Sequence, residues 1–132
     1  MLVRRLAEAP VEEWHKLRTN ILMDAGELGS RNLSVTWIEV PGGVDQQLHS
    51  HEEAEQVYVI TVGSGSMTVA GDEQEVTTGD LVMVPPATDH SIANHGDSDL
   101  CCISVQSPPI TVSEIYGDTV ASGVSDYDDE DY

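Results

Sequence analysis

The chain has 132 residues, which is enough for one domain and too few for two ordinary ones. It carries 24 acidic and 5 basic residues, a formal net charge of −19, and every Lys and Arg lies within the first 31 residues. This balance argues against nucleic acid and anionic membrane surfaces as partners, because both attract proteins through Lys and Arg.

The acidic composition also bears on where the protein works. An Asp- and Glu-rich surface with few Lys is typical of cytoplasmic proteins from salt-accumulating organisms, where molar salt shortens the Debye length to roughly 3 Å. We therefore expect a halophilic source. No apolar stretch approaches the eighteen residues of a membrane span, and no apolar segment follows Arg4-Arg5. Adjacent Cys101 and Cys102 cannot form an ordinary disulfide, so the expected location is the cytoplasm.

The first 31 residues are expected to form a helix and a connector. Pro10 suits a first helical position, and Glu12 can pair with Lys16 four residues on, which predicts a helix over 10–18. Trp14 would dock this helix, and His15 would be a solvated helix residue. Residues 19–31 are predicted to be irregular.

From Asn32 the pattern changes to short runs rich in Val, Ile, Leu and Thr, separated by turn residues such as Pro-Gly-Gly at 41–43. Regularly spaced short strands favour an all-β sandwich or barrel over residues 32–112. Residues 113–132 form an acidic tail whose composition is typical of disorder.

Candidate metal ligands occur in the segment GGVDQQLHSHEEAEQVYVI. On an extended strand, His49 and His51 project to one face, and Glu55 could complete the group. Imidazole and carboxylate together suit one divalent transition metal: Fe, Mn, Ni, Co, Cu or Zn. Taken alone, an H-x-H pair is also compatible with two surface histidines.

A second segment, GDLVMVPPATDHSIAN, strengthens the metal hypothesis. With it, the chain resembles the cupin superfamily, whose motifs read G-x5-H-x-H-x3–4-E-x6-G and G-x5-P-x-G-x2-H-x3-N. The matching residues are Gly43, His49, His51 and Glu55 in the first motif, and Gly79, Pro85, His90 and Asn94 in the second. The resemblance implies that the metal ligands are His49, His51, Glu55 and His90.

Two positions depart from the motifs. Gly63 follows Glu55 after seven intervening residues instead of six, which we interpret as a one-residue insertion in the turn at 62–66. Ala87 replaces the glycine of the second motif. Neither departure changes a predicted ligand.

The resemblance implies a double-stranded β-helix, or jelly-roll barrel, with a short N-terminal helix and with the ligands inside. By strand parity, Glu55, Val57 and Val59 would face inward, whereas Tyr58 and Ile60 would face outward and could bury a homodimer interface. Gln47, Val57 and Ile92 are the residues expected to line a substrate site.

Cupins have many functions, so the family does not determine the activity. The first hypothesis is a mononuclear metal-dependent oxygenase or lyase, with Glu55 as a ligand or proton shuttle. Because the barrel segment has no Lys or Arg, a small neutral chelating substrate is favoured. The alternatives are a non-catalytic metal or small-molecule binding or sensor domain and, with less support, a sugar isomerase.

Overall fold

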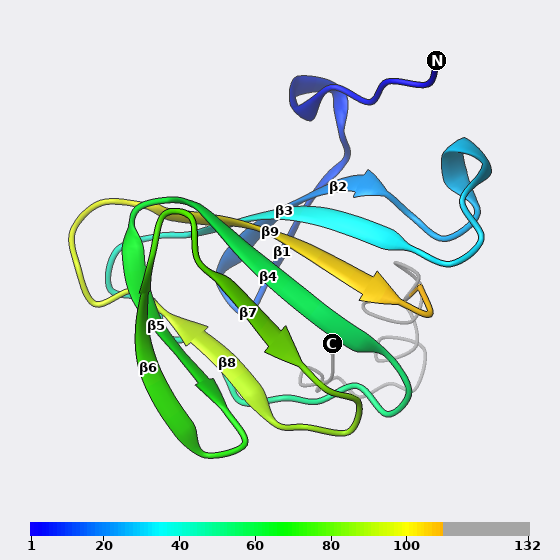
Figure 1. Ribbon diagram of the computed structural model, residues 1–132. Helices are drawn as coiled ribbons and strands as arrows, with labels where there is room; N and C mark the ends of the chain where they lie inside the picture. The colour runs from blue at the N-terminus through cyan, green and yellow to red at the C-terminus, as the bar shows by residue number, and fades with distance from the viewer. Residues whose placement is uncertain (110–132) are drawn as a thin grey trace, which may run out of the picture.

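The computed structural model describes residues 1–109, so the predicted acidic tail at 113–132 lies outside the described residues. Within that range the chain is built almost entirely from antiparallel strands (Figure 1), which confirms the predicted all-β jelly-roll fold. In chain order the elements are η1 (Leu6–Glu8), β1 (Val11–Trp14), β2 (Leu17–Met23), η2 (Glu27–Gly29), β3 (Ser34–Val40), β4 (Glu55–Val62), β5 (Ser64–Val69), β6 (Asp72–Thr77), β7 (Leu81–Val84), β8 (His90–Ala93) and β9 (Leu100–Ser107).

The strands form two sheets that enclose one core. A six-stranded sheet has the order β1-β2-β3-β9-β4-β7, and a three-stranded sheet has the order β6-β5-β8. Figure 1 shows β5, β6 and β8 grouped on one side of the larger sheet. Alternate residues of β3 are buried, as expected when a strand has one face on a core. The core side chains come from both sheets: Leu17, Ile38, Val40, Tyr58, Ile60, Met67, Val76, Val84, Ile92, Leu100 and Cys102.

Segment 43–49 extends the smaller sheet, although it is too irregular to form a named strand. Its backbone pairs antiparallel with β8: Gln46 N donates to Ile92 O over 2.9 Å. The pairing ends in a reciprocal bridge, in which His49 N donates to His90 O (3.1 Å) and His90 N donates to His49 O (2.8 Å). This bridge positions the two predicted motifs beside each other.

The predicted helix at 10–18 is wrong, because these residues begin a β-hairpin, and the predicted irregular connector at 19–31 is wrong over 19–23, which continue the hairpin's second strand. Strands β1 and β2 pair with Trp14 opposite Leu17, and β2 continues the larger sheet by pairing with β3. The two-residue turn, His15-Lys16, has positive φ at both positions (55° and 67°). A nine-residue helix is marginal in water, whereas the hairpin adds two strands to the sheet and buries Trp14 and Leu17.

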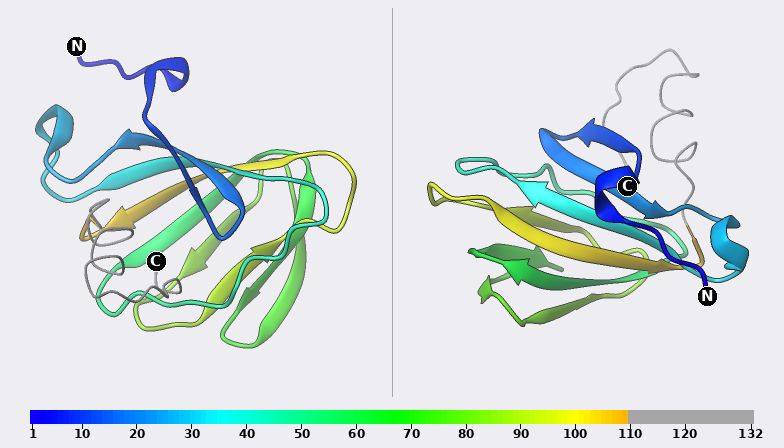
Figure 2. Two further views of the ribbon diagram at one scale, coloured as in Figure 1. Left: turned by 180° about the vertical axis from the view of Figure 1, so that it is seen from behind. Right: turned by 90° about the horizontal axis from the view of Figure 1, so that it is seen from above.

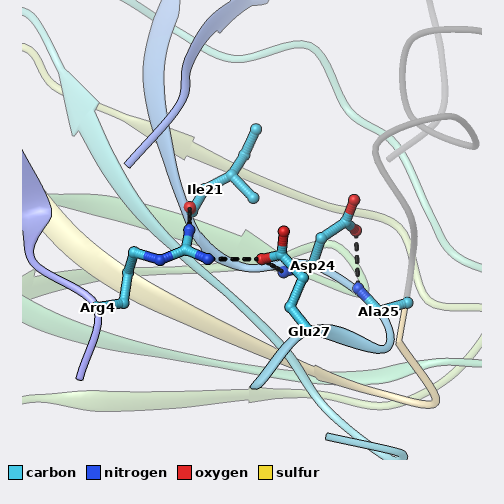
Figure 3. Close-up of polar contacts among 5 residues, drawn as sticks. All are labelled: Arg4, Ile21, Asp24, Ala25 and Glu27. Carbon is cyan, nitrogen blue, oxygen red and sulfur yellow. Dashed lines mark hydrogen bonds and ion pairs between the residues drawn. The ribbon is translucent and has the colours of Figure 1, made fainter. Parts of the chain in front are cut away.

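The far end of this hairpin is held by the N-terminal segment (Figure 3). The Arg4 guanidinium donates to Ile21 O over 3.4 Å and to Glu27 Oε1 over 3.2 Å. The same carboxylate oxygen accepts from Asp24 N at 3.0 Å. One basic side chain therefore links the N-terminal segment, β2 and the turn that leads to β3.

The predicted facing of β4 is also wrong. Tyr58 and Ile60 are each 1% exposed and lie in the core, whereas Val57 and Val59 are only partly buried. Because side chains alternate along a strand, a shift of one residue in the assumed register reverses every side chain. Tyr58 and Ile60 cannot supply a dimer interface, and the homodimer stays a prediction without an assigned face.

Among the described residues, no helix has the length and apolar character needed to cross a membrane. Both helical elements are single 3₁₀ turns of three residues.

Ala87 has φ of 57° in the turn before β8, and its N–H donates to His51 O over 2.6 Å. The turn therefore keeps the left-handed conformation that suits glycine, and a side chain there costs roughly 1–2 kcal/mol.

We expect Ala87→Gly to stabilise the protein by up to about 1 kcal/mol. The substitution removes the strain of the left-handed alanine, and the greater conformational entropy of glycine in the unfolded chain, about 0.4–1 kcal/mol, cancels only part of that gain. Urea unfolding measures the change. Ala93→Gly, in the extended strand β8, is the matched control and should destabilise; a similar loss in both variants would contradict the prediction.

Candidate metal centre

Three histidines from the two predicted motifs meet inside the barrel. His49 and His51 come from the segment before β4, and His90 is the first residue of β8. Each offers one ring nitrogen, and these three atoms lie within 4.8 Å of one another. The ring centroids are 4.2 Å apart for His49 and His90, 5.6 Å for His49 and His51, and 5.4 Å for His51 and His90. We refer to these residues as the three-histidine group.

Backbone carbonyls orient two of the three rings. Nδ1 of His49 lies 2.9 Å from Gln47 O, and Nδ1 of His90 lies 2.9 Å from Thr88 O. A carbonyl oxygen only accepts, so the hydrogen of each neutral ring must be on Nδ1 and the lone pair on Nε2. The Nε2 atoms are buried. This arrangement, in which the second nitrogen is tied to the protein, is typical of histidine ligands of metals.

Burial keeps the group neutral. Desolvation lowers the pKa of His51 from 6.5 to about 3, and the charge of His90 lowers it further, against a smaller opposing effect of the Gln56 side chain. Desolvation also lowers the pKa of His90 and brings that of His49 well below its usual value. Neutral imidazoles are the form that binds metals, so protons compete little for these ligands at neutral pH.

The structure does not bring Glu55 to the three-histidine group. Glu55 is exposed at the start of β4, and its neighbour Gln56 takes the inward position with 1% exposure. Gln56 Nε2 donates to Ser104 Oγ over 2.6 Å. Its Oε1 is buried, and the Gln56 side chain contacts His51, whose pKa it raises slightly against the effect of burial. The side chain that faces His51 is therefore a neutral amide.

The spacing to Gly63 in the sequence indicates that Gln56, one residue after Glu55, takes the inward position. Gly63 lies between β4 and β5 with φ of 88°, and a Cβ there would come within 2.8 Å of Asp99 O. Six residues separate Gln56 from Gly63, which is the spacing of the motif. The irregularity interpreted as an insertion thus places Gln56 at the position of the acidic ligand.

The residues expected to line a substrate site are dispersed. Ile92 is fully buried in the core, and Val57 lies on the face of β4 opposite to Gln56. Gln47 is exposed and lines a pocket of about 230 Å³ between the hairpin turn and residues 43–47. The backbone oxygen of Gln47 contacts Nδ1 of His49.

Two residues of the hairpin, Trp14 and His15, lie next to the group, so the expectation that His15 is a solvated helix residue is wrong. The rings of Trp14 and His49 pack edge to face with centroids 5.5 Å apart, and His15 stacks on Trp14 at 3.6 Å with an interplanar angle of 15°. The His15 ring also lies 5.9 Å from that of His49. Desolvation lowers the pKa of His15 to about 4. No turn motif such as Asn-Gly marks this hairpin, so the sequence offered no signal for it.

The donor set fits a divalent transition ion. Three imidazole nitrogens and one amide oxygen would make up a mixed nitrogen and oxygen site, which suits the predicted Fe, Mn, Co, Ni, Cu or Zn better than Ca²⁺ or Mg²⁺.

The lowered pKa values predict how stability depends on pH. Each folded-state pKa lies below the unfolded value of 6.5, so the unfolded chain binds more protons as the pH falls. The free energy of unfolding of the metal-free protein should therefore be unaffected by these histidines above about pH 6.5, and it should fall progressively toward pH 3. Thermal unfolding in chelator at pH 7 and pH 5 measures the effect. His51→Gln should show a shallower loss, whereas an equal loss would contradict the assignment.

Comparisons with known proteins agree with this geometry. The family model for the cupin domain matches residues 36–106. An uncharacterized protein of Methanocaldococcus jannaschii is 39% identical over 70 residues, which is 53% of this chain and 56% of that protein, so this chain spans little more than half the relative's length. The oxalate-binding protein of Thermotoga maritima is 28% identical over 101 residues, covering 76% of this chain and 78% of that protein.

Solved structures share the fold. The crystal structure of a predicted oxalate decarboxylase from Thermotoga maritima has a TM-score of 0.73 with 23% identity, covering 80% of this chain and 98% of that one. The polyketide cyclase RemF from Streptomyces resistomycificus has a TM-score of 0.71 with 19% identity, covering 82% and 80%. At these identities the likeness concerns the fold alone. The cupin model, in contrast, matches more than half of the chain, and it spans the segments that supply all three histidines. This chain therefore belongs to the cupin family.

Proposed function

We propose that this protein binds one divalent transition-metal ion through His49, His51 and His90, with Gln56 Oε1 as the fourth ligand, and that it takes up a small oxygen chelator at the remaining positions. The observation that carries the proposal is the convergence of three ligand nitrogens within 4.8 Å in a buried site. The orientation of two rings by backbone carbonyls and the buried Gln56 oxygen support it. Bound there, a divalent ion would act as a Lewis acid toward the chelator's oxygens.

The charge of the ligands indicates the class of chelator. Three neutral imidazoles and one amide leave the full +2 charge of the ion uncompensated, whereas a glutamate in place of Gln56 would have reduced it to +1. A buried charge of +2 favours an anionic ligand over a neutral one. The absence of Lys and Arg from residues 32–132 first favoured a neutral substrate. We now favour a small carboxylate or enediolate, for which the ion itself supplies the positive charge.

Two kinds of function use such a site. A binding or sensor protein needs only the ion and the chelator, and the name of the oxalate-binding relative agrees with that role. An oxygenase or lyase also needs a group that moves protons. Among residues 1–109, the cluster of possible ligands contains histidines only, and Glu55 is exposed. Binding is therefore the better-supported proposal, turnover as an oxygenase or lyase is the second, and sugar isomerisation has the likeness of fold alone.

The metal proposal predicts a clear difference between two neighbouring residues. His49→Ala should lower Co²⁺ affinity by at least about 100-fold, and Gln56→Leu by roughly 10- to 100-fold, because each removes a donor from the ion. Glu55→Gln, one residue away on the exposed face, should leave the affinity within about twofold. Isothermal titration with Co²⁺ gives these affinities, and circular dichroism of the metal-free variants checks folding. A loss in Glu55→Gln with none in Gln56→Leu would contradict the assignment.

The anion proposal predicts the effect of adding one negative charge. Gln56→Glu keeps an oxygen donor, so Co²⁺ affinity should be equal or higher, but oxalate should bind the Co²⁺-loaded protein at least about tenfold more weakly. A unit charge 4 Å away contributes about 4 kcal/mol at an effective dielectric constant of about 20, and about 1.4 kcal/mol is already tenfold. Competition titrations with oxalate and with neutral glycerol measure this. Equal weakening of both ligands would contradict the charge argument.

A further inference from the structure

The turn of the β1–β2 hairpin has a conformation that its residues do not favour. Two-residue hairpin turns with positive φ at both positions normally use Asn and Gly, yet this turn is His15-Lys16 with φ of 55° and 67°. Non-glycine residues held in this region concentrate at functional sites, where the surrounding structure maintains the strain. The turn also lies outside residues 36–106, which match the cupin model.

Packing directs the His15 ring toward the three-histidine group. The ring lies flat on Trp14, which is itself buried and packs edge to face with His49. Figure 2 (left) shows the hairpin turn in front of the barrel strands. At 5.9 Å between ring centroids, His15 is a neighbour of His49. It is not one of the three residues whose ligand atoms lie within 4.8 Å of one another, so it is not placed to bind the ion directly.

The two nitrogens of His15 are buried and make no hydrogen bond with any residue from 1 to 109. A neutral imidazole offers one donor and one acceptor. A buried polar atom without a partner is costly, so such atoms are expected to have a function that supplies the partner. Beside an open metal position, a metal-bound chelator is a partner that can accept from or donate to the ring.

Resting on the proposed metal function, we propose that His15 is a positioning residue that hydrogen-bonds a small oxygen chelator while the three-histidine group and Gln56 hold the ion. The hairpin is thus part of the ligand site, and its strained turn places the His15 imidazole beside His49. The chelator recognised in this way has an anionic oxygen for the ion and a second oxygen, within reach of His15, that accepts or donates a hydrogen bond.

The test separates ion binding from chelator binding. The Co²⁺-loaded protein is titrated with oxalate and with acetohydroxamate, and Co²⁺ affinity is measured separately for each variant. His15→Phe keeps an aromatic ring against Trp14 but cannot hydrogen-bond. It should leave Co²⁺ affinity within about threefold and weaken at least one chelator roughly tenfold or more. His15→Asn or His15→Gln should recover most of the loss, and His95→Phe, at an exposed histidine paired with Asp45, should have no effect.

Every other outcome overturns either the role of His15 or the proposed metal function. If His15→Phe binds both chelators as tightly as the wild type, or if neither amide variant recovers the loss, His15 does not act by hydrogen bonding and the inference is wrong. It is equally wrong if the loaded wild type binds neither chelator up to about 10 mM. If the wild type does not bind Co²⁺ at all, the metal function itself fails, which the separate ion titration reveals.

Discussion

The site depends on the backbone pairing between segment 43–49 and β8. These segments are about 40 residues apart in sequence, and each supplies part of the ligand set. The reciprocal bridge of His49 and His90, with hydrogen bonds of 3.1 and 2.8 Å, brings their rings to 4.2 Å. Further along, Ala87 N holds His51 O at 2.6 Å, so the second histidine is tied to the turn before β8. The geometry of the three-histidine group thus follows from main-chain hydrogen bonds, and preorganisation of this kind favours tight binding of an ion.

A second constraint is the neutrality of the site. Desolvation depresses the pKa of all three histidines, and Gln56, the first inward residue of β4, is an amide. The chain as a whole carries 24 acidic residues, but the structure places none of the described ones in the three-histidine group. The acidic surface and the neutral interior are therefore separate features. An ion held in this neutral interior would keep its charge available to an anionic ligand, as proposed above.

The sequence predicts the barrel well because its strands carry strong local signals. From Ser34 onward, the strands are short runs rich in apolar and β-branched residues, and glycines mark several of the turns between them. The N-terminal hairpin lacks such signals: its turn is His15-Lys16, and Glu12 and Lys16 favour a helix locally, so only pairing with β3 decides its structure. At β4 two adjacent residues, Glu55 and Gln56, both fit the motif's variable spacing. Chemistry suggested the carboxylate, and the strand register set by Gly63 places the amide inside.

Metal coordination in a crystal of the Co²⁺-loaded protein tests the central claim most directly. An anomalous difference map at the cobalt edge should show one strong peak inside the barrel, at about 2.0–2.3 Å from Nε2 of His49, His51 and His90 and from Gln56 Oε1. A peak bound instead by Glu55 or by surface carboxylates, or a barrel interior without any peak, would contradict the account.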